Sequence, residues 1–405
     1  MNKNQSKALF PLLFCIVALN MMSVGIILPV LPDLIFSVAA LPNAESAKIG
    51  GLMLLSFAFA QFLFAPLLGA LSDRFGRRPI LLCGLFGLSL DFLILALAPS
   101  IIVLVIARFI GGIFGSTYPT INAIIADTTA PEDRPARYGI ISAAWGTGFI
   151  LGPVAGGVLG EFGPRIPFFV ASIAILIAFL LAVFLLPETL KPKNRQSFNL
   201  LKANPLGAIL DMFRFPGIPQ ALFALLCMLT ASQAILSTFP FFVREVYGWS
   251  SGLTGLAFGF YAAGTIVVQI SLVSFLSRKM GLARSILVGF SAQCLSYVLL
   301  AISGQPAMAF VCMAIGAIGG ICFPLIQSLT TSLVDETSQG RLQGAISSAA
   351  SLSALFGVFL MPQIYARFSD AEGVYFPGAA FALGAGLTLM AMMSILAMRK
   401  PAPTA

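Results

Sequence analysis

The chain has 405 residues, of which 59% are hydrophobic and only 9% charged, and its formal net charge is +8. About a quarter of the residues of soluble globular proteins carry charge, so this composition excludes that class. The chain contains no histidine, which excludes Ser-His-Asp triads, imidazole proton relays and histidine-ligated metals. Its six cysteines show no metal-ligand spacing. We therefore expect an integral membrane protein that is not an enzyme and that needs neither a metal nor another cofactor.

Apolar windows of roughly 20 residues, the length that an α-helix needs to cross a bilayer, occur about twelve times along the chain. They are centred near residues 20, 59, 89, 113, 148, 177, 229, 264, 292, 319, 352 and 385. An outer-membrane β-barrel would need alternating polar and apolar residues, and segments such as "ILIAFLLAVFLL" show no such alternation. The sequence predicts an all-α polytopic membrane protein with twelve transmembrane helices.

The basic residues are distributed unevenly between the two sides of the predicted spans. When the spans are threaded alternately from a cytoplasmic N-terminus, 18 of the 23 Lys and Arg residues fall on the cytoplasmic side. The exceptions are Lys48, Arg165, Arg244 and Arg367 outside and Arg108 within a span. This asymmetry follows the positive-inside rule and predicts that both termini are cytoplasmic. The net positive charge is thus explained by topology, and nucleic acid is not an expected partner.

A short charged loop, "GALSDRFGRRP" at 69–79, joins the second and third predicted spans. Its acid can meet its arginines in ion pairs that hold in one conformational state and break in another, which makes it a candidate gating loop. The alternative is a simple topology anchor, but an anchor needs neither the acid nor the glycines. The candidate gating residues are Gly69, Asp73, Arg74, Gly76, Arg77 and Arg78.

Two ionisable residues lie deep in the predicted spans, Asp91 in the third and Arg108 in the fourth. At 1.5 Å per residue their depths differ by about 5–10 Å, so we expect a water-bridged contact more readily than a direct pair. A charge at such depth costs ~3 kcal/mol or more and indicates a functional site. Asp91 would load and unload a proton while Arg108 responds to its charge. Alternatively, a hydrogen-bonded Asp91 only fixes the third helix against its neighbours.

Amide and aromatic side chains recur inside the predicted spans, together with Arg108. Single intramembrane amides also serve as contacts between helices, so both roles remain open for them. An amide and aromatic lining suits a neutral or amphipathic solute, and the arginine can receive an anionic group. The candidate cavity residues are Asn20, Gln61, Arg108, Tyr118, Asn122, Trp145, Gln233, Tyr261, Gln269 and Gln327.

The longest polar stretch, at 187–205, separates six predicted spans from six others. We predict an N-terminal six-helix bundle at 1–187, a cytoplasmic linker at 188–215 and a C-terminal six-helix bundle at 216–405. The loop at 69–79 has a counterpart in "SFLSRKMGLAR" at 274–284, and "IIADTTAPEDR" has one in "TSLVDETSQGR". Both offsets are a little over 200 residues. Two such repeats with a binding site between them are typical of transporters.

Three motifs together resemble the major facilitator superfamily. The loop Gly69 to Pro79 resembles its signature between the second and third helices, and "LxxxRxxGG" resembles its fourth-helix motif. That second motif comprises Leu104, Arg108, Gly111 and Gly112. The third, "Gx8Gx3GPx2GG", resembles the fifth-helix motif of drug/proton antiporters, in which small residues allow close helix packing. Its residues are Gly139, Gly148, Gly152, Pro153, Gly156 and Gly157.

Within this superfamily, "GIILPVLP", "SLDFLILA" and "IADTT" look closest to tetracycline-resistance exporters, mainly over residues 20–165. The resemblance implies two six-helix bundles related by a pseudo-two-fold axis. It also implies titratable residues in the first, ninth and eighth helices, where this chain has Asn20, Gln293 and Thr265. These neutral residues depart from the pattern on which proton coupling and tetracycline transport would rest.

The prediction is a secondary transporter of the inner membrane, a monomer, that exports a small amphipathic compound in exchange for protons by alternating access. Its partners are then the solute, protons and lipid. Two alternatives within transport are an exporter of a native metabolite such as a siderophore and a facilitator without proton coupling. An alternative from another class is a membrane receptor or assembly partner that does not transport.

Overall fold

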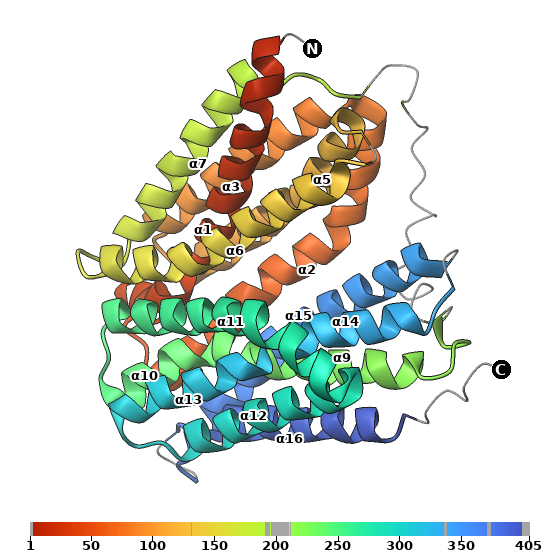
Figure 1. Ribbon diagram of the computed structural model, residues 1–405. Helices are drawn as coiled ribbons and strands as arrows, with labels where there is room; N and C mark the ends of the chain where they lie inside the picture. Colours follow the sequence, from red (N-terminus) through yellow and green to blue (C-terminus); the bar gives the residue numbers. More distant parts are fainter. Residues whose placement is uncertain are drawn as a thin grey trace, which may run out of the picture. The chain divides into compact units, whose positions relative to one another are not determined.

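The computed structural model describes residues 3–130, 132–190, 195, 210, 212–335, 338–370 and 374–398. Over these residues the chain forms helices, turns and loops and no strand (Figure 1). Within this described part of the chain, twelve segments are long and apolar enough to cross a membrane, which confirms the predicted number. Most of the predicted linker at 188–215 lies outside the described residues.

The first six spans contain seven helices. They are α1 (Lys3–Ala39), α2 (Asn43–Phe75), α3 (Arg77–Leu97), α4 (Ile101–Phe114), α5 (Tyr118–Thr128), α6 (Arg134–Gly160) and α7 (Ile166–Leu185). The second six begin with α9 (Ile218–Gln233), the π-helical segment η3 (Ala234–Thr238) and α10 (Phe239–Tyr247). They continue with α11 (Ser251–Met280), α12 (Leu282–Ile302), α13 (Pro306–Gly319), α14 (Cys322–Ser332), α15 (Gln339–Phe368) and α16 (Ala379–Leu396).

Three spans that the hydrophobic pattern predicts as single helices are interrupted. The fourth breaks between α4 and α5 at residues 115–117, and the tenth breaks between α13 and α14 at residues 320–321. In the seventh, η3 widens the helix just before Pro240, which has no N–H to donate to the preceding turn. Glycine at 115 and 320, followed by proline at 119 and 324, weakens the helix at the other two breaks.

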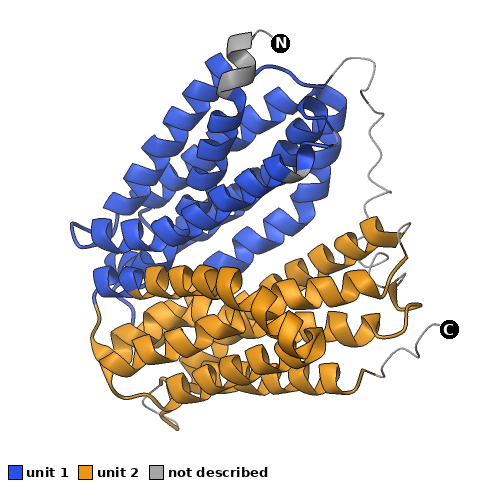
Figure 2. Ribbon diagram, viewed as in Figure 1, with its two compact units in different colours: residues 1–42, 52–203, 250–256 blue, residues 43–51, 204–249, 257–405 orange. Residues whose placement is uncertain are grey.

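The chain forms two compact units (Figure 2). Unit 1 comprises residues 1–42, 52–203 and 250–256, and unit 2 comprises residues 43–51, 204–249 and 257–405. The first residues of α2 therefore belong to unit 2, and the first residues of α11 belong to unit 1. Asn43 donates hydrogen bonds to the Phe241 carbonyl and to the Tyr365 hydroxyl, each over 2.9 Å. The Gly252 N–H donates to the Glu161 carboxylate over 2.7 Å.

Within unit 1, α1 packs along α6 and α7, and α3 packs along α4 and α7. Two serines join α3 to α7, because Ser89 and Ser172 each donate a hydrogen bond to the other's carbonyl over 2.9 Å. Within unit 2, α12 packs on α13 and α16, and α9 packs on α15 and α16. In both units the third helix of the repeat, α3 or α12, thus lies against the first half of a broken span.

Candidate functional site

The two deep charges meet directly in unit 1. The Arg108 guanidinium on α4 donates to Asp91 Oδ2 on α3, and the two side chains are 3% and 0% exposed. The expectation of a water-bridged contact was therefore wrong. The long arginine side chain spans the difference in depth, and Gly111 leaves room for the carboxylate. A Cβ at Gly111 would collide with both carboxylate oxygens of Asp91.

Two aromatic rings flank the arginine. The guanidinium carbon of Arg108 lies 5.2 Å from the ring centroid of Phe57 on α2 and 5.2 Å from that of Phe92 on α3. Each desolvated cation–π contact of this kind contributes about 2 kcal/mol. Sequence reasoning missed both rings because their contact depends on how three helices are rotated about their axes.

The pair leaves hydrogen-bonding capacity unused. Asp91 Oδ1 and Arg108 Nε are buried and have no hydrogen-bond partner among the described residues. A buried ion pair needs further hydrogen bonds to offset its desolvation, so this pair is held less firmly than its geometry alone suggests. The free oxygen is a place where a proton or a water molecule can bind.

Asn20 ties α1 to the break in the fourth span. Its Nδ2 donates to Thr117 Oγ1 over 2.9 Å, and both residues are buried. Further along α5, the Asn122 carbonyl accepts from the Tyr138 hydroxyl over 3.4 Å, while Asn122 Oδ1 is buried without a partner among the described residues. Of these two predicted amides, Asn122 lies on the segment that continues from Arg108, and Asn20 hydrogen-bonds to the start of that segment from α1.

The predicted gating loop forms a network within unit 1. Arg77 pairs with Asp73 over 2.5 Å and with Asp127 at the end of α5 over 3.2 Å. The Glu188 carboxylate accepts from the backbone N–H of Arg77 over 2.9 Å and of Arg78 over 3.2 Å. An acid at this position suits the positive end of a helix dipole, so Glu188 caps α3.

Three further loop residues have separate surroundings. Gly76 has φ +115°, a backbone conformation that glycine adopts readily, and it packs on Glu188. Arg74 is exposed, and its guanidinium carbon lies 5.2 Å from the ring centroid of the adjacent Phe75. Gly69 has no atom close enough to contact an added Cβ. Sequence reasoning missed Asp127 and Glu188, whose only signal was an acid at the end of a predicted span.

Four glycines on α6 allow its close approach to α1. An added Cβ on any of these glycines would collide with α1. The contacts recur every four residues along both helices. The pairs are Gly148 with Ala18, Gly152 with Met22, Gly156 with Ile26 and Gly160 with Val30. The fifth-helix motif supplies three of them, and Gly160 lies beyond it.

The other motif residues on α6 differ in their contacts. Pro153 packs against Gly25 on α1, and Gly157 packs against Gly255 near the start of α11. Gly139 is different, because an added Cβ there would meet nothing within 4 Å.

The remaining cavity candidates are divided between the units. In unit 1, Gln61 is half-buried, Tyr118 is exposed, and Trp145 stacks on Phe149 with ring centroids 5.4 Å apart. In unit 2, Gln269 donates to the Gly320 carbonyl over 3.0 Å, and Gln327 donates to Gln343 over 3.1 Å. Gln269 thus hydrogen-bonds to the break in the tenth span.

Two further candidates in unit 2 face other helices. A Cβ at Gly357 on α15 would meet the Gln233 side chain. The Tyr261 ring on α11 lies next to Gly316 on α13. No group of three His, Cys, Asp or Glu residues suited to a metal ion occurs in the described part of the chain.

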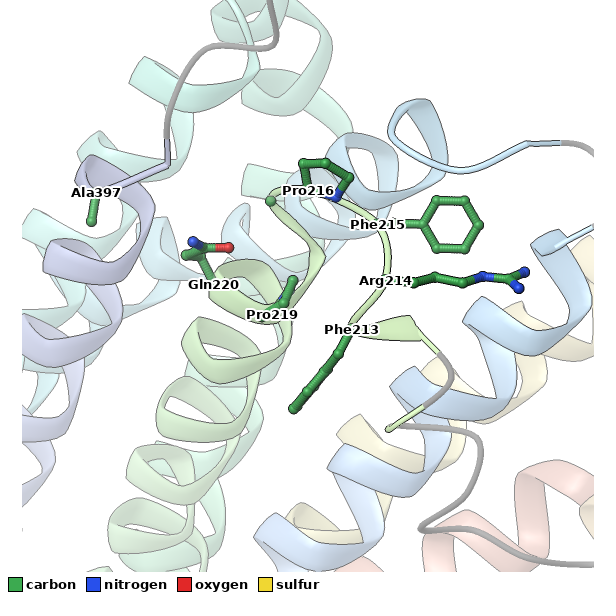
Figure 3. Close-up of a pocket in the computed structure, with 8 residues that line it drawn as sticks. Phe213, Arg214, Phe215, Pro216, Pro219, Gln220 and Ala397 are labelled. Carbon is green, nitrogen blue, oxygen red and sulfur yellow. The ribbon is translucent and has the colours of Figure 1, made fainter.

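A cavity of about 340 Å³ lies at the start of α9 in unit 2 (Figure 3). Figure 3 shows Arg214 extending to one side and Gln220 lying toward Ala397 on the other. Arg214 donates to Ser338 Oγ, just before α15, over 3.2 Å. The cavity is lined by Phe213, Arg214, Phe215, Pro216, Gly217, Pro219, Gln220 and Ala397. None of the predicted cavity residues lines it.

Twelve apolar spans, a break at the corresponding place in two units and a buried charged pair are features of a polytopic membrane transporter. The sequence model of the family described as Major Facilitator Superfamily matches residues 13–358 and 254–405. The chain therefore belongs to the major facilitator superfamily, which is a family of transporters rather than enzymes.

Proteins with similar sequences agree with this family assignment. The class C tetracycline resistance protein of Escherichia coli is 33% identical over 379 residues, which cover 94% of each chain. Multidrug resistance protein 2 of Bacillus subtilis is 28% identical over 96% of each chain. The likeness to tetracycline-resistance proteins therefore extends well beyond residues 20–165, where the motifs are most evident.

Solved structures show the same fold at low sequence identity. A nucleoside transporter superposes with a TM-score of 0.78 at 14% identity, covering 96% of this chain and 98% of its own. A D-xylose–proton symporter superposes with a TM-score of 0.73 at 16% identity, covering 98% of each chain. The predicted major facilitator fold is thereby confirmed.

Proposed function

We propose that this protein exports a small amphipathic compound, drug-like or tetracycline-like, across the inner membrane in exchange for protons. Both termini lie in the cytoplasm, and the solute site opens to the two sides in turn. The family and the names of the relatives support export of a drug-like compound. The Asp91–Arg108 pair is the observation that supports proton coupling, because it places one titratable carboxylate beside one fixed cation away from water.

The geometry suggests how the pair responds to a proton. Asp91 Oδ2 is occupied by Arg108, so the proton binds Oδ1, which has no other partner among the described residues. The neutral acid attracts the guanidinium far less than the carboxylate does. Arg108 keeps its contacts with Phe57 and Phe92, and these offset part of the cost of an unpaired buried cation. The arginine is then available to an anionic group of the solute.

In this proposal Asp91 carries the proton coupling, because the other positions at which a titratable residue is expected are neutral in this chain. Asn20, Gln293 and Thr265 stand where the resemblance implies titratable residues, and amides and hydroxyls do not titrate near neutral pH. Asn20 is already engaged with Thr117. A chain with three titratable residues at these positions can divide the proton steps among them, whereas in this proposal the steps are concentrated on Asp91.

Uptake of tetracycline into everted membrane vesicles tests the proposal. We expect uptake that requires an imposed proton gradient and that collapses when the gradient is dissipated. In vesicles with Asp91→Asn, gradient-driven uptake is lost, while exchange between equal internal and external pools continues. Asp133→Asn is the matched control, because it makes the same chemical change at an exposed acid before α6.

Two outcomes would contradict the proposal. Normal gradient-driven uptake by Asp91→Asn would remove the coupling role of Asp91. Uptake by the parent protein that is indifferent to the gradient would replace antiport by facilitated diffusion.

A further inference from the structure

Trp145 on α6 combines strong exposure with a fixed orientation. Its ring stacks on Phe149 with a centroid distance of 5.4 Å and an interplanar angle of 9°. Phe149 covers one face of the indole, yet Trp145 remains 43% exposed. The exposed surface must therefore lie on the opposite face and along the ring edge. A rigid aromatic face presented in this way is a stacking surface.

The exposed face does not point the same way as the large exposed aliphatic side chains of α6, which are the candidates for contact with lipid. Ile140, Leu151 and Val158 are 41%, 50% and 47% exposed and form one stripe along the helix. At about 100° per residue, Trp145 lies roughly 120–140° around the helix from that stripe. Gly148, which packs on α1, lies between the stripe and Trp145. The indole is thus exposed on a different side of α6 from that stripe, and Gly148 separates the two at the level of Trp145.

The helix surface beside the stacked pair is made of small residues. Gly139 and Ser142 are exposed, Gly146 is half-buried, and an added Cβ at Gly139 would meet nothing within 4 Å. Toward the other end of α6 the same face closes, because Gly157 packs tightly against residues 251–255. The nearer of the small residues, Ser142 and Gly146, leave the surface of α6 beside the indole uncovered.

We propose that Trp145, held in place by Phe149, is the platform on which a planar, fused-ring portion of the transported compound stacks. This inference rests on the proposed export function and specifies the substrate class as compounds with a flat aromatic ring system. Stacking on a preoriented ring loses little conformational entropy and tolerates many ring substituents. The platform selects flatness and leaves the charged or polar groups of the ligand to other residues.

Direct binding to purified protein in detergent tests the platform without a gradient. The probes are ethidium, a planar fused-ring cation, and tetraphenylphosphonium, which has the same charge but rings that are not coplanar. We expect Trp145→Leu to weaken ethidium binding about tenfold, as expected for one lost aromatic stacking contact, and tetraphenylphosphonium binding less than twofold. Trp145→Tyr retains a ring and restores most of the ethidium affinity.

The chain has only two tryptophans, which permits a spectroscopic check. Trp249 is 8% exposed and packs against Phe239 and Phe310 in unit 2. In the Trp249→Phe protein, ethidium should quench the remaining Trp145 emission with saturation. In the Trp145→Phe protein, the emission of Trp249 should fall much less. Free N-acetyltryptophanamide corrects for absorption by the probe.

Leu151→Ala is the control for substitution on α6, since Leu151 belongs to the exposed aliphatic stripe, and it should leave both affinities unchanged. Ethidium binding that is absent in the parent, or unchanged in Trp145→Leu, would overturn the platform. So would an equal loss for both probes, which would indicate a disturbed helix. These results are independent of the vesicle experiment, so antiport can fail while the platform stands, and the reverse.

Discussion

The helix pairs α3–α4 in unit 1 and α12–α13 in unit 2 have the same arrangement but different polar side chains between the helices. We call each helix pair, with the polar residue and the glycine that face one another, a frame. Ser296 lies 205 positions after Asp91, and Gly316 lies 205 positions after Gly111. An added Cβ at Gly111 would collide with the Asp91 carboxylate, and one at Gly316 would lie 2.7 Å from Ser296 Oγ. In each unit a glycine on the broken span thus makes room for one polar side chain on the preceding helix.

The polar contents of the two frames are unlike. Met313, fully buried, occupies the place of Arg108, and Ser296 donates to the Cys312 carbonyl over 2.7 Å. Unit 2 therefore joins the two helices with one neutral hydrogen bond, and unit 1 uses a charged pair. Since the neutral hydrogen bond suffices to pack the two helices in unit 2, the charges in unit 1 need another explanation, and the proton coupling proposed above is one.

Replacing Arg108 by methionine, the residue at the corresponding position in unit 2, is expected to have the largest effect on stability. Arg108→Met leaves Asp91 buried without its cation, and removing one member of a buried ion pair costs roughly 3–5 kcal/mol. The free energy of unfolding, measured by titration with sodium dodecyl sulfate, should fall by about that amount. Met313→Leu, a volume-conserving change in unit 2, is the control and should cost less than about 1.5 kcal/mol. An Arg108→Met protein as stable as the parent would contradict a charged pair.

Replacing Asp91 as well, so that both residues of the pair match unit 2, should recover part of the lost stability. The double variant Asp91→Ser, Arg108→Met carries the unit 2 pair in unit 1 and leaves no buried charge uncompensated. We expect its free energy of unfolding to exceed that of Arg108→Met by about 2 kcal/mol, since neutral replacements of buried pairs are often tolerated. Gradient-driven uptake should nevertheless remain absent. A double variant less stable than either single variant would show that the two frames are not equivalent.

The two glycines should differ in their tolerance of alanine. Gly111→Ala displaces the whole Asp91 carboxylate and should cost about 2–3 kcal/mol, as overpacking does. Gly316→Ala displaces only a hydroxyl that can rotate, and alanine favours the helix, so the net cost should be below about 1 kcal/mol. Thermal unfolding midpoints in detergent measure the difference. Equal losses at both positions would mean that the ion pair is not confined by Gly111.

The smallest difference in stability is expected between glycine-to-alanine substitutions in the loops that precede α3 and α12. Gly76 and Gly281 both have positive φ, at +115° and +80°, so alanine is strained at either position. A Cβ at Gly76 also collides with Glu188, whereas one at Gly281 meets nothing within 4 Å. We expect Gly76→Ala to cost about 1 kcal/mol more, the value of one N-terminal cap. Glu188→Gln should reduce that difference, and a larger loss at Gly281 would contradict it.

Part of this comparison was predictable from the sequence. The loops at 69–79 and 274–284 and their offset indicate repeats, and the apolar windows locate the spans. The pairing of Ser296 with Gly316 was not predictable, because a buried serine and a helical glycine are common residues without a distinctive pattern. The helix breaks at 115–117 and 320–321 were not predictable either, since their glycines lie within continuous apolar stretches.

The sequence predicted the charged residues of the candidate site but not the residues that surround them. Asp91 and Arg108 stand out in any hydropathy profile, because a charge in an apolar run is conspicuous by itself. Phe57, Phe92 and Glu188 do not, because aromatic residues fill most spans and acids commonly end them. Their importance follows only from contacts across 16 to 111 residues of sequence.

The sequence by itself determined the twelve spans, the superfamily and the one deep acid and one deep base. These depend on composition within a window, or on motifs that are contiguous along the chain. Only the tertiary structure decided that Asp91 and Arg108 bond directly, that two rings flank the guanidinium and that Trp145 is exposed away from the stripe of Ile140, Leu151 and Val158. Each of these depends on how one helix is rotated against another, and that rotation is set by packing of distant residues.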